Sequence, residues 1–166
     1  MLLFMVTSEE TILILGLGNI LLTDEGVGVH VVEHLRQNTQ NDHANLKLLD
    51  GGTMGLTLLV DMEDADAMIV VDAALLDQEP GAVQVFEGAN MDHFLRHRGR
   101  SPHDIGLDDI LDGLRLREAV PERRALVGIQ PAVLTVGEHL TPDVQAAVPK
   151  AAEIIRALVE SWKTAS

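Results

Sequence analysis

Four short aliphatic runs recur along the chain, and each one is followed closely by a residue that ends strands. The runs cover residues 12–15 (ILIL), 46–49 (LKLL), 67–71 (AMIVV) and 125–129 (ALVGI), and Gly, Asp or Pro comes after each of them. Uninterrupted apolar runs of this length are typical of strands that are buried on both faces, as in a parallel sheet. This pattern requires a fold that covers a mostly parallel sheet on both sides.

Helical patterns separate these runs. One helix is predicted to begin near Asp24, a second to cover about 54–62 and a third to cover 107–116. The last helix is predicted to have Thr141 as its N-cap and to run to about Ser161. Alternating strands and helices predict an α/β fold, a three-layer sandwich with a sheet of about five strands and helices on both faces.

One further strand, the fourth along the chain, is predicted at 83–87, after the turn signal Pro80-Gly81. Only about ten residues separate it from the run at 67–71, which is too short for a helical crossover, so this pair is predicted to be antiparallel. Residues 88–106 are predicted to form a long, irregular connection. Residues 1–10 are interpreted as a loose tail, and 11–166 as a single domain.

Composition excludes several classes of function. The formal net charge is −14, which argues against nucleic-acid binding and against docking on anionic membranes. There is no cysteine, so disulfides, thiol nucleophiles and thiolate metal sites are excluded. Neither a signal peptide nor an apolar stretch of about 20 residues is apparent, so a soluble, cytoplasmic protein is expected. The excess of acidic residues favours solubility, and alternatively it would suit binding to a partner segment that carries basic residues.

Three side chains are candidates for a metal site. Glu25 follows the first strand, Asp72 follows the third, and His103 lies on the long connection. If the first and third strands are neighbours, both carboxylates face one crevice at the carboxyl edge of the sheet, and they need a cation or a shared proton. Such ligands suit Ni, Zn, Mn or Co, and the spacing does not choose between them. Each residue also has an ordinary structural interpretation, as a helix-start, turn or surface residue.

Four motifs resemble those of the hydrogenase maturation protease family, in the same order and spacing. They are Gly16-Leu17-Gly18-Asn19-Ile20-Leu21-Leu22-Thr23-Asp24-Glu25-Gly26-Val27-Gly28, Asp50-Gly51-Gly52-Thr53, Val71-Asp72-Ala73 and Ser101-Pro102-His103-Asp104-Ile105-Gly106. The resemblance runs from about residue 11 to about residue 160. One departure is Gln130-Pro131, where many members of the family have Glu-Pro.

The resemblance implies an endopeptidase, classed with the aspartyl proteases, that cleaves a C-terminal extension from the large-subunit precursor of a nickel–iron hydrogenase. It implies that Glu25, Asp72 and His103 bind metal, that the nickel is supplied by the substrate, and that no organic cofactor is needed. A monomer is expected. Hydrolysis could use the metal or a carboxylate general base. The catalytic candidates are Asp72 and Asp50. Asp50 is a candidate for that base because it ends the second strand, and it is also an ordinary turn residue before two glycines.

Three other interpretations were weighed. A dinucleotide site would need a glycine at position 21, which is Leu21. His30 and His34 spell the inverted zincin pattern H-x-x-E-H, but they lack a third ligand and are predicted to be helix-edge residues. His93 and His97, at the same spacing, are discounted equally. The third interpretation is a non-catalytic chaperone that binds the nickel site of the precursor.

Overall fold

The central strands are buried on both faces, and their side chains alternate between two apolar layers. The computed structural model describes residues 10–38, 45–97 and 106–164. In strand β1 (Ile12–Leu17), Ile12 and Ile14 face one layer, whereas Leu13 and Leu15 face the other. This period of two, with no exposed face, explains why the sequence shows continuous apolar runs.

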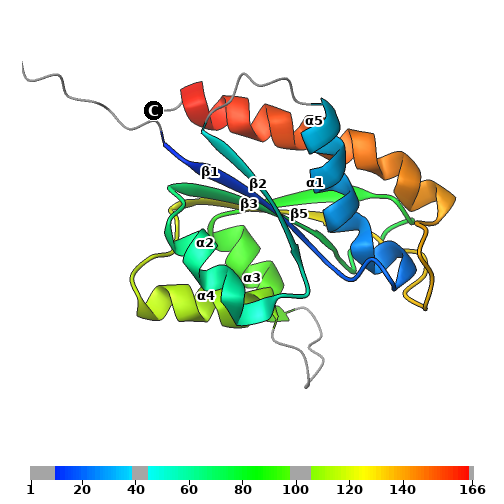
Figure 1. Cartoon of the computed structure of the whole chain (residues 1–166), viewed down its shortest axis with the longest axis horizontal. Coiled ribbons are helices and arrows are strands. Elements are labelled where there is room, and N and C mark those ends of the chain that lie inside the picture. The colour runs from blue at the N-terminus through cyan, green and yellow to red at the C-terminus, as the bar shows by residue number, and fades with distance from the viewer. Residues whose placement is uncertain (1–9, 39–44, 98–105, 165–166) are drawn as a thin grey trace, which may run out of the picture.

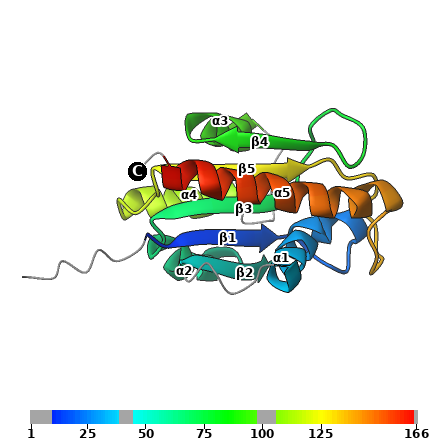
Figure 2. The same ribbon diagram turned by 90° about the horizontal axis from the view of Figure 1, so that it is seen from above.

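Five strands of the described residues form one sheet in the order β2-β1-β3-β5-β4 (Figure 2). The other strands are β2 (Leu46–Gly52), β3 (Ala67–Ala73), β4 (Val83–Glu87) and β5 (Arg123–Ile129). All neighbours are parallel except β4, which is antiparallel to β5. The predicted sheet is therefore confirmed, including its antiparallel strand.

Helices cover both faces of the sheet (Figure 1). On one face lie α1 (Val27–Asn38) and α5 (Pro142–Thr164), and on the other lie α2 (Leu59–Glu63), α3 (Ala89–His97) and α4 (Leu107–Leu116). Two short 3-10 helices, η1 (Thr23–Gly26) and η2 (Gly55–Leu58), precede α1 and α2. The predicted three-layer α/β sandwich is confirmed. None of the helices that the structure describes is long and apolar enough to span a bilayer.

The prediction of an irregular connection over 88–106 was wrong for its first half, which forms helix α3. Met91 and Leu95 are four residues apart and bury one side of this helix against the sheet. Asp92 accepts hydrogen bonds from the Arg124 guanidinium, with Asp92 Oδ2 to Arg124 Nη2 at 2.8 Å, and it also pairs with Arg115. The helix therefore depends on β5 and α4, which follow it in the sequence.

The strand order creates a crevice at the carboxyl end of the sheet. From β1 the chain passes through α1 to β2 on one side, and from β2 it passes through α2 to β3 on the other side of β1. The chain leaves β1 toward β2 and leaves β3 toward β4, in opposite directions along the sheet, so the loops after β1 and β3 diverge. Ligands bind at such switch points in open α/β sheets.

Candidate active site

Glu25 is fixed in place by the tight loop that follows β1. It lies in η1, where it is half-buried, and one of its carboxylate oxygens is inaccessible to solvent. Gly18 in this loop has a φ of 117°, and a Cβ on Gly18 would lie 1.8 Å from the Glu25 carbonyl oxygen. Only glycine fits both the backbone angle and this close contact, so Gly18 allows the loop to bring Glu25 back over the end of β1.

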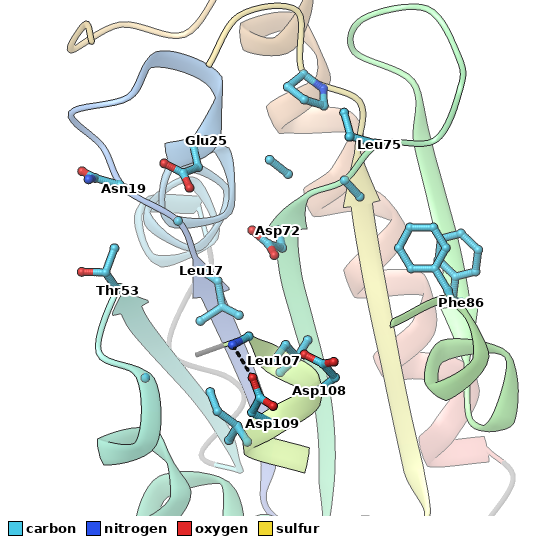
Figure 3. Close-up of a pocket in the computed structure, with 18 of the residues that line it drawn as sticks. Leu17, Asn19, Glu25, Thr53, Asp72, Leu75, Phe86, Leu107, Asp108 and Asp109 are labelled. Carbon is cyan, nitrogen blue, oxygen red and sulfur yellow. Dashed lines mark hydrogen bonds between the residues drawn. The ribbon is translucent and has the colours of Figure 1, made fainter. Parts of the chain in front are cut away.

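Asp72 reaches the same place from the neighbouring strand. It is the second-last residue of β3, where it pairs with Gly128, and its side chain is half-buried. The strands β1 and β3 are hydrogen-bonded neighbours, as the common crevice required. Glu25 and Asp72 line one cleft, and Figure 3 shows both side chains at its upper end. Both carboxylates therefore line the same cleft, at the ends of neighbouring strands.

The third predicted ligand, His103, lies outside the described residues. Within the described residues, no group of three or more His, Asp or Glu side chains is arranged to hold a metal ion. The metal-binding set of Glu25, Asp72 and His103 thus stays a prediction, of which the structure describes the two carboxylates.

The cleft has the size of a polypeptide site. Its volume is about 1510 Å³, whereas pockets for small molecules usually measure about 300–1,000 Å³. Its walls come from the loops after β1, β2 and β3 and from helices α3 and α4. None of the described residues that line it is Lys or Arg. The cleft therefore combines room for an extended chain with an acidic lining.

Several lining residues were missed by the sequence interpretation. Asp108 and Asp109 begin α4 and lie at the lower end of the cleft in Figure 3. Asp109 Oδ2 accepts a hydrogen bond from the Gly106 amide at 3.0 Å, which stabilises the start of the helix. His93 and His97, which were discounted, stack on each other with ring centroids 4.1 Å apart and also line the cleft.

Asp24 binds a distant loop to the first motif. It is fully buried, and its carboxylate accepts hydrogen bonds from the amides of Ala132 (2.9 Å), Val133 (3.0 Å) and Thr141 (2.7 Å) and from the Thr141 hydroxyl (2.9 Å). Burial alone would raise the pKa of this carboxyl, but the hydrogen bonds from Thr141, Val133 and Ala132 outweigh it and hold the pKa below its ordinary value. The residue next to Glu25 thereby anchors residues 132–141.

The candidate base Asp50 has a different position from that expected. It lies inside β2, opposite Gly16, and is exposed. Its Oδ1 accepts a hydrogen bond from the Gly52 amide at 2.9 Å, which is an Asx turn. Asp50 is not among the residues that line the cleft. This hydrogen bond thus supports the turn, and a catalytic role stays a prediction.

Gln130, the departure from the family pattern, supports the loop after β3. Its side-chain Oε1 accepts a hydrogen bond from the Leu76 amide at 2.7 Å, and its Nε2 donates to the Pro131 carbonyl at 3.1 Å. A glutamate could accept the first bond but could not donate the second. The amide therefore suits this loop.

His30 and His34 do not contribute to the cleft. Both are half-buried on α1, whose buried face consists of other residues, and neither lines the cleft. Burial and the charge of His139 hold the pKa of His30 below its ordinary value. The described residues offer them no third ligand, as the inverted zincin interpretation would need.

The fold and the cleft together define an α/β protein with carboxylates in a large cleft at the carboxyl edge of its sheet. A family profile described as "Hydrogenase maturation protease" matches residues 29–158. The chain belongs to the hydrogenase maturation protease family and is a maturation endopeptidase, a hydrolase of peptide bonds.

Individual relatives agree with this assignment. The chain is 40% identical over 153 residues to the hydrogenase 2 maturation protease of Escherichia coli, covering 90% of this chain and 92% of the relative. It is 38% identical to the hydrogenase expression/formation protein HupD of Rhodobacter capsulatus, covering 92% of this chain and 73% of the relative. Among solved structures, the maturating endopeptidase HybD from E. coli matches with a TM-score of 0.81 and 40% identity, over 91% of this chain and 93% of that one.

Proposed function

We propose that this endopeptidase acts in the cytoplasm on the large-subunit precursor of a nickel–iron hydrogenase. It removes the C-terminal extension of the precursor after nickel has been inserted, and it recognises that nickel. The observation that carries the proposal is the meeting of Glu25 and Asp72 in one cleft at the switch point. The maturation role of the family supplies the class of substrate.

The chemistry of the two carboxylates suits a cation that arrives with the substrate. Glu25 and Asp72 line the same cleft, and no Lys or Arg is among its described lining residues. Two neighbouring carboxylates are stabilised in the charged form by a cation. With the imidazole of His103 as the third donor, they would make an N/O ligand set that nickel accepts. The ion belongs to the precursor, and its protein ligands would complete the coordination.

The cleft also suits the tail of the precursor. Its volume exceeds that of ordinary small-molecule pockets, and the loops after β1 and β2 form part of its lining. An extended segment can lie along these loops, with the scissile peptide bond beside Asp72. We assign the general base to Asp72. The carboxylate oxygen that does not hold the metal would take a proton from the attacking water, and it would give this proton to the leaving amine when the C–N bond breaks.

Asp50 is the second candidate for the base, and one substitution distinguishes the two. Asp50→Asn keeps the Oδ1 acceptor for the Gly52 amide, so the turn and the fold should persist. We expect processing to be retained, because Asp50 lies outside the residues that line the cleft. Loss of processing in a folded Asp50→Asn protein would instead move the base from Asp72 to Asp50.

The test of the proposed function is a processing assay on matched precursors with and without nickel. Wild-type enzyme should shorten the loaded precursor only, as seen by a size shift and by mass spectrometry of the released peptide. Asp72→Asn should slow cleavage by about 10²–10⁴-fold, the usual contribution of a general base. Glu153→Gln, a matched change of an exposed carboxylate on α5, should have no effect. Equal cleavage of loaded and unloaded precursor would refute recognition of nickel.

A further inference from the structure

Exposed apolar side chains are concentrated at the carboxyl edge of the sheet. Eight of the ten large hydrophobic side chains that are exposed in the described residues lie on the loops that follow β1, β2, β3 and β5. The other two, Val60 and Leu116, lie on helices α2 and α4. The exposed apolar side chains of these four loops form what we name the docking face, which includes Leu21, Met54, Leu56, Leu75, Leu134 and Val136.

The docking face is continuous with the cleft. Met54, Leu75 and Leu134 belong to the docking face and also line the cleft. Figure 3 shows Leu75 above Asp72, on the loop that leaves β3. A protein whose tail enters the cleft must therefore lie against these side chains. Isolated exposed apolar residues need no explanation, but a contiguous set at a binding site indicates a protein interface.

Hydrogen bonds from Thr23 and to Asp24 hold one of the four loops in its exposed position. The Asp24 carboxylate accepts the Val133 amide, and the Thr23 hydroxyl donates to the carbonyls of Val133 (2.7 Å) and Thr135 (3.1 Å). The Thr23 amide also donates to the Gly137 carbonyl at 2.8 Å. Val136, between these anchors, is 87% exposed. A loop that is fixed in this way presents its apolar side chains without the entropy cost of ordering them on binding.

The charges on the four loops indicate the chemistry of the partner. Residues 18–26, 51–58, 74–82 and 130–141 contain no Lys or Arg. They do contain acidic residues, and Asp77, Glu79 and Glu138 are exposed. A surface that complements them would have apolar residues at its centre and Lys or Arg around them.

We propose that the docking face binds the folded body of the precursor, at an apolar patch with basic residues around it that surrounds the base of the cleavable tail. This inference rests on the proposed function, because it takes the precursor as the substrate. The tail and the metal would occupy the cleft, while the docking face would provide affinity for the rest of the precursor.

The experiment compares two pairs of substitutions that are matched in residue type. Val136→Ser and Leu75→Ser alter the docking face, whereas Val60→Ser and Leu116→Ser alter exposed side chains of the same types elsewhere. Binding of the loaded precursor is measured by titration calorimetry, and KM by the processing assay. Burial of one such side chain corresponds to a factor of at least about 10 in affinity. We therefore expect Kd and KM to rise together by about tenfold for the first pair only.

Salt provides a second measurement. Raising the ionic strength from about 0.05 to about 0.5 M should weaken binding of the precursor, because it screens the acidic loops from the basic partner surface. Unchanged or tighter binding at high salt would overturn the charge complementarity on which the choice of partner rests.

Other outcomes are equally decisive. Equal Kd values for Val136→Ser and Val60→Ser would overturn the docking face. If sedimentation shows that wild-type enzyme is a dimer and Val136→Ser is a monomer with unchanged precursor binding, the occupant is a second copy and the proposal fails. Tight, mutation-sensitive binding without cleavage would support the docking face while refuting the proposed function.

Discussion

Asp24→Ala should destabilise the protein far more than the position of Asp24 in the short 3-10 helix η1 would suggest. The carboxylate accepts four hydrogen bonds from Ala132, Val133 and Thr141. A hydrogen bond to a charged group stabilises by about 1.5–3 kcal/mol, so simple addition gives about 6–12 kcal/mol. That sum is too large, because bonds that share one carboxylate are not additive.

Access of water reduces the expected loss in the free energy of unfolding further. Ala132 and Val133 are exposed residues, so water can reach their amides once the carboxylate is removed. The two bonds from Thr141 are harder to replace, because they end in the buried space of the Asp24 side chain. They alone set a loss of about 3–5 kcal/mol in the free energy of unfolding. Since domains are usually stable by about 5–15 kcal/mol, the variant should still fold without denaturant.

The assay is urea unfolding, followed by far-UV circular dichroism and by fluorescence of the single tryptophan, Trp162, which is 7% exposed. The midpoint should fall while the slope m is unchanged. Asp143→Ala is the matched control, because Asp143 is an exposed acid in the first turn of α5 and should cost only about 0.3–1 kcal/mol. A loss below about 1 kcal/mol for Asp24→Ala, or a loss equal to that of the control, would refute the reasoning.

Three further predictions concern other parts of the molecule. Asp92→Asn should lower the free energy of unfolding by about 1–2 kcal/mol at pH 7. Hydrogen bonds from Arg124 lower the pKa of Asp92 in the folded state, so the wild type should lose this extra stability as the pH falls below about 4. Unfolding curves of both proteins, measured over a range of acidic pH values, would show this loss. His30→Ala with His34→Ala should leave processing intact, and loss of activity together with stoichiometric zinc would favour the zincin interpretation instead. Gly18→Ala should lower the melting temperature, with a cost of at least about 2 kcal/mol from its positive φ and backbone contact, and an unchanged melting temperature would contradict that.

The sheet was predictable because its central strands β1, β3 and β5 are mostly buried on both faces. Such strands show as uninterrupted aliphatic runs, and the ten-residue spacing before 83–87 revealed the antiparallel strand. The strands nevertheless extend beyond these runs: β1 continues to Leu17 and β3 to Ala73. The turn residues Gly16 and Asp72 were taken as strand ends, although both still pair with neighbouring strands.

Helix α3 was missed because its stability comes from other parts of the chain. It is nine residues long, too short to be stable alone. Its Asp92 is paired with Arg124 on β5 and Arg115 on α4, both distant in the sequence. The pair His93 and His97 was visible in the sequence, but its position beside the cleft was not, because the helix that carries it was not predicted.

The two carboxylates of the site could be predicted from their places after neighbouring strands, together with the family motifs. The role of Asp24 could not, because its partners lie 108 to 117 residues away in the sequence. The sequence alone does not reveal that Asp24 is buried, because its burial depends on these distant hydrogen-bond donors. For Asp50, the Asx turn with Gly52 was the simpler interpretation of the same motif.

The hydrogen bonds between Asp24 and Thr141 also determine when the site can form during synthesis of the chain. Residues 12–73, with β1, β2, β3 and both carboxylates of the site, leave the ribosome first. The donors for the buried Asp24 carboxylate are added only when residues 132–141 have been made. Until then the loop that holds Glu25 has no anchor on its far side. A nascent chain therefore contains the acidic residues before it has a settled site, and it becomes a competent protease only near the end of translation.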